Sequence, residues 1–392
     1  MMFASEKVNS LPPYLFSQFQ RKKEELEAKG IDVIDLGIGA PDLPTPDFVI
    51  DRLIQEAKVT ENHRYSPYSG CQEFREAVAY FYKHHYGVTL DPNEEILTLI
   101  GSKEGIAHLM QAVLDPGDHV LLPDPGYPVY STAVHLAGGE SVSLPLEPDN
   151  GYVPRYEDVP VEVLRQAKLM LLNYPSNPTA ATVEINTFME AVSFAKENNL
   201  ILAHDAAYDL VTFDGYKSPS VLQVPQAKER AVEFGSLSKS FNMTGWRIGY
   251  VVGNKEVIAA LSTLKSNLDS SQFLAIQKAA ATALTSDLFA VEGHNRIFEK
   301  RRDKLVSALT DMGISVDLPK GTIFVWAKVP EGFTSLSFAD TLLEKAGVIV
   351  TPGSAFGEVG EGYFRMALSV TTERLDEVIH RLQQLNFKEV PK

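Results

Sequence analysis

The sequence predicts an α/β protein with an open, mostly parallel β-sheet and a second, smaller α+β domain. At 392 residues the chain is longer than one ordinary domain. Short apolar runs alternate with helical patterns as far as residue 253, and this alternation is typical of successive βα units. Further apolar runs follow a long helical pattern near the end of the chain. We therefore expect two packed domains.

Each expected strand is a short apolar run beside turn-forming residues. These runs cover residues 33–36, 96–100, 119–122, 168–172, 200–204, 231–234, 248–253, 324–329, 348–351 and 364–368. The expected helices are amphipathic stretches that cover residues 15–28, 46–58, 72–84, 106–113, 257–265, 273–284, 291–311 and 373–385. Gly30 and Gly313 are placed to end two of them, and Thr45 with Pro46 starts another.

Composition narrows the class of partner. The net charge of −15 disfavours binding to nucleic acid or to an anionic membrane. Cys71 is the single cysteine, so it cannot form an internal disulfide, and the first residues lack the apolar core of a signal peptide. No apolar run approaches the roughly 20 residues that cross a bilayer. We expect a cytoplasmic protein that binds small molecules.

Lys239 is the residue that most needs an explanation. It lies among hydroxyl side chains in residues 236–249, after one apolar run and before another, so we expect it in a loop at a strand end. A deprotonated lysine amine forms a Schiff base with a carbonyl, which suits pyridoxal phosphate. Ser236 and Arg247 would hold the phosphate. The alternative is a solvated lysine on a polar loop.

Asn177 and Asp205 also follow apolar runs. Asp205 lies 28 residues after Asn177, and Lys239 lies 34 residues after Asp205. Asn177 should donate to the phenolic oxygen of the cofactor, and Asp205 should keep its pyridine nitrogen protonated so that the ring withdraws electrons. Tyr208 would bond the ring oxygen. Successive βα units bring such residues to one edge of a sheet. Asparagine before proline is otherwise a common turn.

Small residues between a strand and a helix predict an anion site at residues 101–105, because the first N–H groups of a helix have no acceptor within it. We assign Ser102 and Lys103 to the cofactor phosphate. Tyr127, after the next strand, should stack on the pyridine ring. A capped helix without a ligand is the alternative for the first site.

These motifs, taken together and in this order, resemble the class I/II (fold type I) aminotransferases from residue 36 to residue 385. The resemblance implies a pyridoxal-phosphate-dependent transferase of amino-acid metabolism, with a seven-stranded sheet and no metal. It implies an N-terminal arm and part of the small domain in residues 1–45, a large domain in 46–286 and a small domain in 287–392. It also implies a homodimer with shared active sites.

Some roles rest on the resemblance alone. It places Gly39 near the substrate α-carboxylate and Arg365 on that carboxylate, and it has Tyr65 reach the phosphate of the other subunit. The alternative for Gly39 is a plain turn, and for Arg365 it is a structural salt bridge. The alternative for Tyr65 is a tyrosine that packs a loop. Ala180 stands where the family usually has glycine, which puts the local turn in doubt and leaves Asn177 in place.

Residues 100–108 and 123–130 most resemble LL-diaminopimelate aminotransferases, which implies LL-diaminopimelate and 2-oxoglutarate as substrates. Methionine, aspartate or alanine transamination and a carbon–sulfur lyase remain alternatives. A transcription regulator with an aminotransferase-like domain is a further one, disfavoured by the acidic charge. Candidates to bind the distal end of the donor are Lys103, Glu104, Asp269 and Ser270, each of which could equally be solvent-exposed or a helix cap.

Overall fold

The computed structural model describes the backbone of residues 3–11 and 15–385 and the side chains of residues 3–11 and 21–385. The strands are β1 (Ile34–Asp35), β2 (Ile96–Leu99), β3 (His119–Asp124), β4 (Glu140–Pro145), β5 (Ala167–Asn173), β6 (Ile201–Asp205), β7 (Ala231–Ser236), β8 (Gly249–Gly253), β9 (Phe324–Lys328), β10 (Val348–Ile349), β11 (Thr351–Pro352) and β12 (Tyr363–Ala367). The helices are α1 (Glu6–Asn9), α2 (Leu15–Glu27), α3 (Asp47–Ala57), α4 (Gln72–His85), α5 (Ser102–Val113), α6 (Val129–Ala137), α7 (Val161–Leu164), α8 (Ile185–Glu197), α9 (Leu237–Ser240), α10 (Lys255–Leu268), α11 (Leu274–Leu284), α12 (Phe289–Asp311), α13 (Ser335–Ala346) and α14 (Thr372–Gln383).

The larger sheet confirms the predicted α/β class. Within residues 15–385 it has seven strands in the order β2-β8-β7-β6-β5-β3-β4, and β8 alone runs antiparallel to its neighbours. Its central strands are parallel and in close register, with Asn173 opposite Asp205 and Asp205 opposite Phe234. Their carboxyl ends therefore meet at one edge of the sheet, where ligands of open α/β sheets bind.

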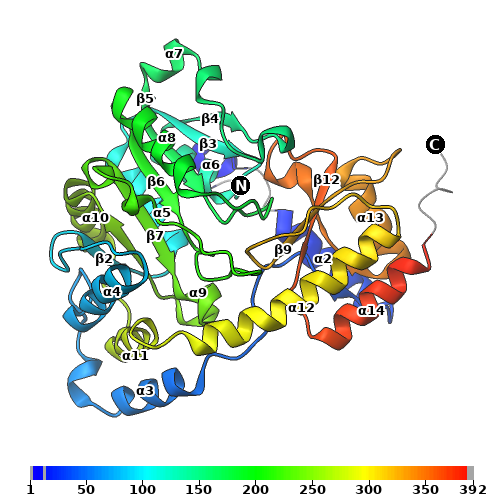
Figure 1. Ribbon diagram of the computed structural model, residues 1–392, viewed down its shortest axis with the longest axis horizontal. Coiled ribbons are helices and arrows are strands. Elements are labelled where there is room, and N and C mark those ends of the chain that lie inside the picture. Colours follow the sequence, from blue (N-terminus) through cyan, green and yellow to red (C-terminus); the bar gives the residue numbers. More distant parts are fainter. Residues whose placement is uncertain (1–2, 12–14, 386–392) are drawn as a thin grey trace.

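Helices cover both faces of this sheet (Figure 1). In β5, Leu169 and Leu171 pack with α5, α6 and α10, whereas Met170 and Leu172 pack on the other face with α4, α8 and α11. Side chains alternate between the faces of a strand, so a strand buried on both faces is apolar throughout. This explains why the central strands are continuous apolar runs in the sequence.

The smaller part of the molecule is built on a second sheet, and α12 leads to it from the larger part (Figure 1). In the described part of the chain, β11, β12 and β9 form an antiparallel sheet, and β1 pairs in parallel with β10. Residues near the start of the chain thus join residues near its end. The proposed boundaries at residues 45/46 and 286/287 stay predictions.

Several details differ from the sequence-based expectations, among them the helices α6, α8 and α13, which were not predicted. Lys239 lies in the single helical turn α9 and not in a loop, because Ser236 caps that turn by accepting a hydrogen bond from the Ser238 amide at 3.2 Å. The edge strand β4 was not predicted, since most of its residues are exposed or half-buried and it lacks an apolar run.

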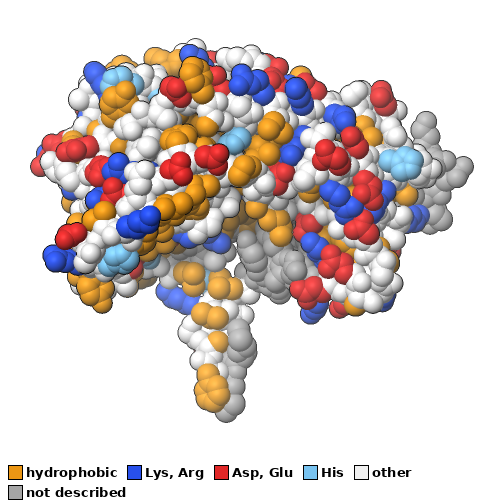
Figure 2. All heavy atoms as spheres, turned by 90° about the horizontal axis from the view of Figure 1, so that it is seen from below, with side chains coloured by type: hydrophobic (Ala, Val, Ile, Leu, Met, Phe, Trp, Pro, Cys, Tyr) orange, Lys and Arg blue, Asp and Glu red, His pale blue; other side chains and the backbone are white. Residues whose placement is uncertain are grey.

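The face of the molecule that carries α3 and α12 is mixed in character. Seen from the side of α3 and α12, hydrophobic side chains form separate groups among charged ones (Figure 2). None of the helices in the described ranges is long and apolar enough to span a bilayer.

Candidate active site

A cavity of about 410 Å³ lies at the carboxyl edge of the large sheet and extends to the smaller part of the molecule. It is lined by residues that follow β3, β5, β6 and β7, by the start of α5, by the turn after β1, and by β9 and β12. Its size is that of a small-molecule site. The fold thus gathers residues from 38 to 365 around one space.

The cavity is strongly basic although the chain is acidic. Among the described residues that line it, the charged ones are Lys103, Lys239, Arg247, Arg365 and Asp205, four basic and one acidic, in a chain of net charge −15. Cations gathered in a half-enclosed space favour a ligand with several negative charges. A phosphate together with a carboxylate would meet this condition.

Lys239 points into the cavity from α9. Its Nζ donates to the Gly39 carbonyl at 2.7 Å and lies 5.9 Å from the centre of the Tyr208 ring. Burial, and then the positive charges of Arg365 and Arg247, lower the pKa of Lys239 to about 8. At neutral pH roughly one amine in ten is therefore deprotonated, far more than for a free lysine, and this fraction rises with pH. The amine is prepared to act as a nucleophile.

One end of the cavity is suited to an anion. Ser102 and Lys103 form the first turn of α5, whose backbone N–H groups lack acceptors within the helix. A Cβ on Gly101, which has φ +85°, would lie 2.2 Å from Arg247 Nη2, so glycine lets the guanidinium approach this turn. Burial, and then Arg247, lower the pKa of Lys103. Two cations held close together are stabilised by a shared anion.

Asp205, at the end of β6, is buried in the middle of the cavity wall. Its Oδ2 accepts a hydrogen bond from the Tyr130 hydroxyl at 2.7 Å, and its Oδ1 accepts one from the Ala207 amide at 3.3 Å. Burial raises the pKa of Asp205, whereas the Tyr130 hydrogen bond opposes this rise. A buried carboxylate that faces a cavity is a ready partner for a cationic ring nitrogen.

Asn173 connects two of the predicted residues. Its Nδ2 donates to the Asp205 carbonyl at 2.7 Å, and its Oδ1 accepts from the Asn177 amide at 2.8 Å. The Asn177 side chain in turn accepts from Arg365 Nη1 through Oδ1, at 2.6 Å. A primary amide also carries two donors on nitrogen, so Asn177 can bind a ligand oxygen at the same time.

Arg365 is 2% exposed and lines the cavity from β12. It donates to Asn177 Oδ1 and, at 2.6 Å, to the Gly37 carbonyl, which are neutral acceptors that orient the guanidinium without cancelling its charge. Its guanidinium carbon lies 4.1 Å from the Phe324 ring centre and 4.7 Å from that of Phe356. This stacking holds the planar fork ready for a carboxylate.

The turn after β1 closes the same end of the cavity. A Cβ on Gly39 would lie 2.4 Å from the Phe324 ring, so a larger residue would displace that ring. Arg301 of α12 holds Asp42 with two hydrogen bonds, at 2.7 and 2.9 Å. Glycine is thus required at position 39 by packing.

The cavity brings together most of the residues predicted from sequence: Gly39, Ser102, Lys103, Tyr127, Asn177, Asp205, Tyr208, Ser236, Lys239, Arg247 and Arg365. Tyr65 is not among its lining residues and is 93% exposed. The individual roles of all these residues stay predictions.

Other residues in or beside the cavity were not predicted from the sequence. Tyr130, Asn173 and Phe324 line the cavity, and Phe356 stacks on Arg365. Tyr130 and Asn173 lie in the same sequence motifs as Tyr127 and Asn177. Their nearness to those two residues could have indicated them. Phe324 and Phe356 carried no signal of their own, because an apolar residue in a strand or turn is ordinary core.

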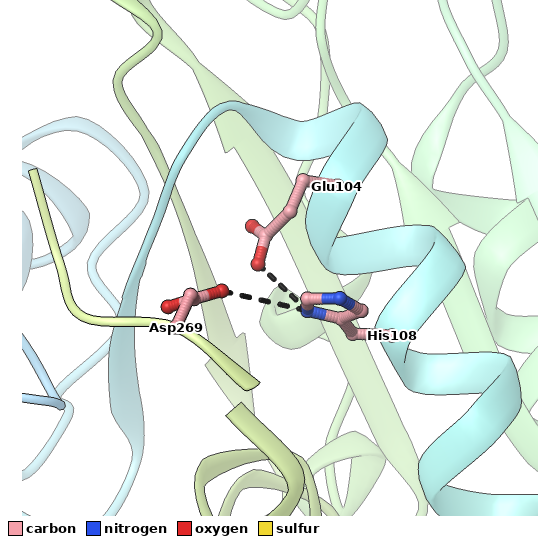
Figure 3. A group of neighbouring side chains, drawn as sticks. All are labelled: Glu104, His108 and Asp269. Carbon is pink, nitrogen blue, oxygen red and sulfur yellow. Dashed lines mark ion pairs between the residues drawn. The ribbon is translucent and has the colours of Figure 1, made fainter. Parts of the chain in front are cut away.

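Two of the candidates for the distal end of the donor are engaged elsewhere. Glu104 and Asp269 converge with His108 (Figure 3), and the Glu104 Oε1 to His108 Nδ1 distance is 2.7 Å. Lys265, which is 1% exposed, lies 2.9 Å from Glu104 Oε1 and 2.7 Å from Asp269 Oδ1. Its ammonium supplies the positive charge that a metal ion would bring to these carboxylates. The group therefore acts as an ion-pair cluster outside the cavity.

These residues fit pyridoxal phosphate. The cavity combines an amine of lowered pKa for its aldehyde, a helix N-terminus with Lys103 and Arg247 for its dianion, and a buried carboxylate for its ring nitrogen. These three features match the aldehyde, the phosphate and the ring nitrogen of this cofactor. Arg365 lines the same cavity, and a guanidinium there can pair with a carboxylate.

Comparison with known proteins leads to the same chemistry. The chain is 50% identical to LL-diaminopimelate aminotransferase of Moorella thermoacetica over 98% of both chains. It is 49% identical to the enzyme of that name from Syntrophobacter fumaroxidans, over 98% of this chain and 99% of that one. Among solved structures, substrate-bound BacF from Bacillus subtilis superimposes with a TM-score of 0.95 at 38% identity, over 98% of both chains.

The family model for aminotransferases of class I and II matches residues 31–382, which is nearly the whole chain. This match and the geometry of the cavity agree on a transamination between an amino acid and a 2-oxo acid. The chain belongs to the class I and II aminotransferases and is a pyridoxal-phosphate-dependent transaminase.

Proposed function

We propose that this transaminase takes its amino group from LL-diaminopimelate and gives it to a 2-oxo acid such as 2-oxoglutarate. The observation that carries the choice of donor is the 50% identity, over nearly the full length, with an enzyme named for that substrate. The basic cavity is compatible with both substrates, because each brings carboxylates.

We assign the phosphate to Ser102, Lys103, Ser236 and Arg247. The arginine offers a planar fork, Ser102 and Lys103 offer helix N-terminal N–H groups, and the serines offer hydroxyls. These residues would hold the phosphate and so would fix the cofactor relative to Lys239.

The remaining residues act at the ring and at the substrate. When bound, pyridoxal phosphate supplies an aldehyde that links to amines and a ring that withdraws electrons from the carbon being deprotonated. Asp205 would pair with the ring nitrogen, Asn177 and Tyr208 would donate to the ring oxygen, and Tyr127 would stack on the ring. Lys239 would hold the cofactor through its amine and would also move a proton at the substrate Cα.

Arg365 binds the α-carboxylate, with Gly39 beside it. This places the Cα–H bond near Lys239, because the Lys239 amine already contacts the Gly39 carbonyl at 2.7 Å. Holding donor and base together in one geometry removes much of the entropic cost of the reaction.

A panel of amino donors tests the substrate. With 2-oxoglutarate as acceptor, LL-diaminopimelate should give a kcat/KM at least about 10²-fold above that of methionine, because a site built for a distal ammonium and carboxylate leaves these groups unpaired when the donor lacks them. Glutamate formation is the measurement. Activity with methionine or aspartate and none with LL-diaminopimelate would contradict the proposed donor. It would not contradict the assignment of the protein as a transaminase. Release of pyruvate and ammonia from cystathionine without glutamate formation would indicate a carbon–sulfur lyase instead.

We further propose a cytoplasmic homodimer in which Tyr65 of each subunit completes the phosphate site of the other. The loop that carries Tyr65 is fixed by Gln277, which donates to Ser66 Oγ and accepts from the Cys71 amide, both at 2.7 Å. A fixed loop that presents a 93% exposed tyrosine is suited to a partner surface. Cys71 is a buried free thiol, which supports a reducing compartment.

Mixed dimers test the shared site. A Lys239→Ala subunit paired with a Tyr65→Ala subunit has one site with both changes and one site with neither. Co-expression at limiting cofactor should therefore restore up to about a quarter of wild-type activity, given random pairing. Lys239→Ala alone should be inactive, and Tyr65→Ala alone should bind the cofactor about tenfold more weakly. A mixture no more active than the mean of its parents, or a fully active monomer in sedimentation, would contradict the shared site.

A further inference from the structure

The Tyr130 hydroxyl makes a contact that the roles assigned so far do not include. Tyr130 is 2% exposed on α6, and its OH donates to Asp205 Oδ2 at 2.7 Å, across 75 residues of sequence. The ring packs edge-on against Tyr127, with 5.7 Å between centres, and lies in the core formed by α5, α6 and α10. The ring thus belongs to the core, while the hydroxyl reaches the cavity wall.

This hydrogen bond favours one form of Asp205. A phenol donates readily to a carboxylate, whereas a protonated carboxyl group is a poorer acceptor and carries a proton of its own. Burial raises the pKa of Asp205, and the hydrogen bond from Tyr130 opposes this rise. Burial, and then the Asp205 charge, raise the pKa of Tyr130 well above that of a free phenol, so the hydroxyl keeps its proton and remains the donor.

The hydrogen bond from Tyr130 also distinguishes the two side-chain oxygens of Asp205. Oδ2 is taken by Tyr130, whereas Oδ1 accepts the longer bond from the Ala207 amide at 3.3 Å. A carboxylate oxygen has more than one acceptor position, so Oδ1 can take a further, stronger donor. Asn173 holds the backbone of the same residue through the Asp205 carbonyl at 2.7 Å. Asp205 is thereby fixed at both side chain and backbone before any ligand binds.

We propose that Tyr130 is a positioning residue that keeps Asp205 ionised and turned toward the pyridine nitrogen of the cofactor. This inference rests on the proposed role of Asp205 and extends it by one residue. Tyr130 acts only through Asp205, so it matters only for a cofactor whose ring carries a nitrogen at that position.

The last statement gives a direct test. The full-length protein, freed of cofactor, is titrated with pyridoxal 5′-phosphate and with 1-deazapyridoxal 5′-phosphate, in which a C–H replaces the ring nitrogen. Tyr130→Phe keeps the ring and its packing and removes the hydroxyl. It should weaken the binding of pyridoxal phosphate by about tenfold, the size of a charge-assisted hydrogen bond. Binding of the deaza analogue should change less than about twofold, because that ring offers Asp205 no N–H.

A matched control is Tyr174→Phe. Tyr174 is 1% exposed, and its hydroxyl donates to the Tyr152 carbonyl at 2.6 Å, away from the cavity lining. It removes an equally buried hydroxyl, so it should leave the ratio of the two affinities unchanged. Thermal unfolding of both variants confirms that they are folded.

A second measurement reports the ring nitrogen itself. With nitrogen-15-labelled pyridoxal phosphate bound, the wild-type protein should show a pyridinium shift, and Tyr130→Phe should move it toward that of neutral pyridine. Equal losses for both cofactors, or no loss for either, would overturn the role of Tyr130. A wild-type protein that binds both cofactors equally and shows a neutral ring nitrogen would overturn the role of Asp205, and the inference with it.

Discussion

Replacement of Lys239 with alanine should lower the turnover of amino transfer by at least about 10³-fold, because one side chain both attaches the cofactor and moves the proton. The amine is buried, has a pKa lowered to about 8, and lies 2.7 Å from the carbonyl of Gly39 beside the proposed substrate site. Steady-state formation of glutamate from 2-oxoglutarate measures the effect.

Two controls separate the amine from its charge. Lys239→Arg keeps a positive charge but has no nucleophilic amine, since a guanidinium does not deprotonate in proteins. It should be as inactive as Lys239→Ala. Small primary amines in solution should restore part of the activity of the alanine variant and none of that of the arginine variant, whose side chain fills the space. Normal turnover in either variant would remove Lys239 from its assigned role.

Substitution of Arg365 by lysine should weaken every amino-acid donor together, by about 1.5–3 kcal/mol, or roughly tenfold to a hundredfold in KM. The charge remains, but the planar fork that can pair with both oxygens of a carboxylate is lost. The stacking of the guanidinium on two rings is lost as well. Its carbon lies 4.1 Å from the Phe324 ring centre and 4.7 Å from the Phe356 ring centre.

A matched control is Arg374→Lys. Arg374 is an arginine outside the cavity lining that pairs with Asp32 at 2.8 Å, and its replacement should leave the kinetics unchanged. Amine donors without an α-carboxylate should be affected little by Arg365→Lys. A loss confined to a single amino acid would mean that Arg365 binds the substrate side chain instead.

The strand ends were predictable because local pattern and topology act together there. Asn177, Asp205 and Lys239 each follow an apolar run, and the parallel register of β5, β6 and β7 brings the ends of those runs to one edge. A helix start soon after β2 was likewise predictable, since small residues between a strand and a helix are a local feature. Arg365 and Gly39 needed the family resemblance, because neither lies in a distinctive local pattern.

The residues that support the site were not predictable from local pattern. Tyr130 meets Asp205 across 75 residues, and Lys265 meets Glu104 across 161. Such pairings depend on how α5, α6 and α10 pack against the sheet, and sequence periodicity shows which face of a helix is buried but not what it meets. For this reason the sequence leaves Glu104 and Asp269 as candidate substrate ligands, whereas in the structure both bind Lys265.

Covalent trapping measures directly whether Lys239 carries the cofactor. The protein loaded with pyridoxal phosphate is reduced with borohydride, which makes the link between lysine and cofactor permanent, and its peptides are then weighed by mass spectrometry. The phosphopyridoxyl group should be found on Lys239 and on no other lysine. Its presence on Lys103 or Lys265 in place of Lys239, or its absence from every peptide of a protein active in amino transfer, would contradict the assignment of this cavity as the active site.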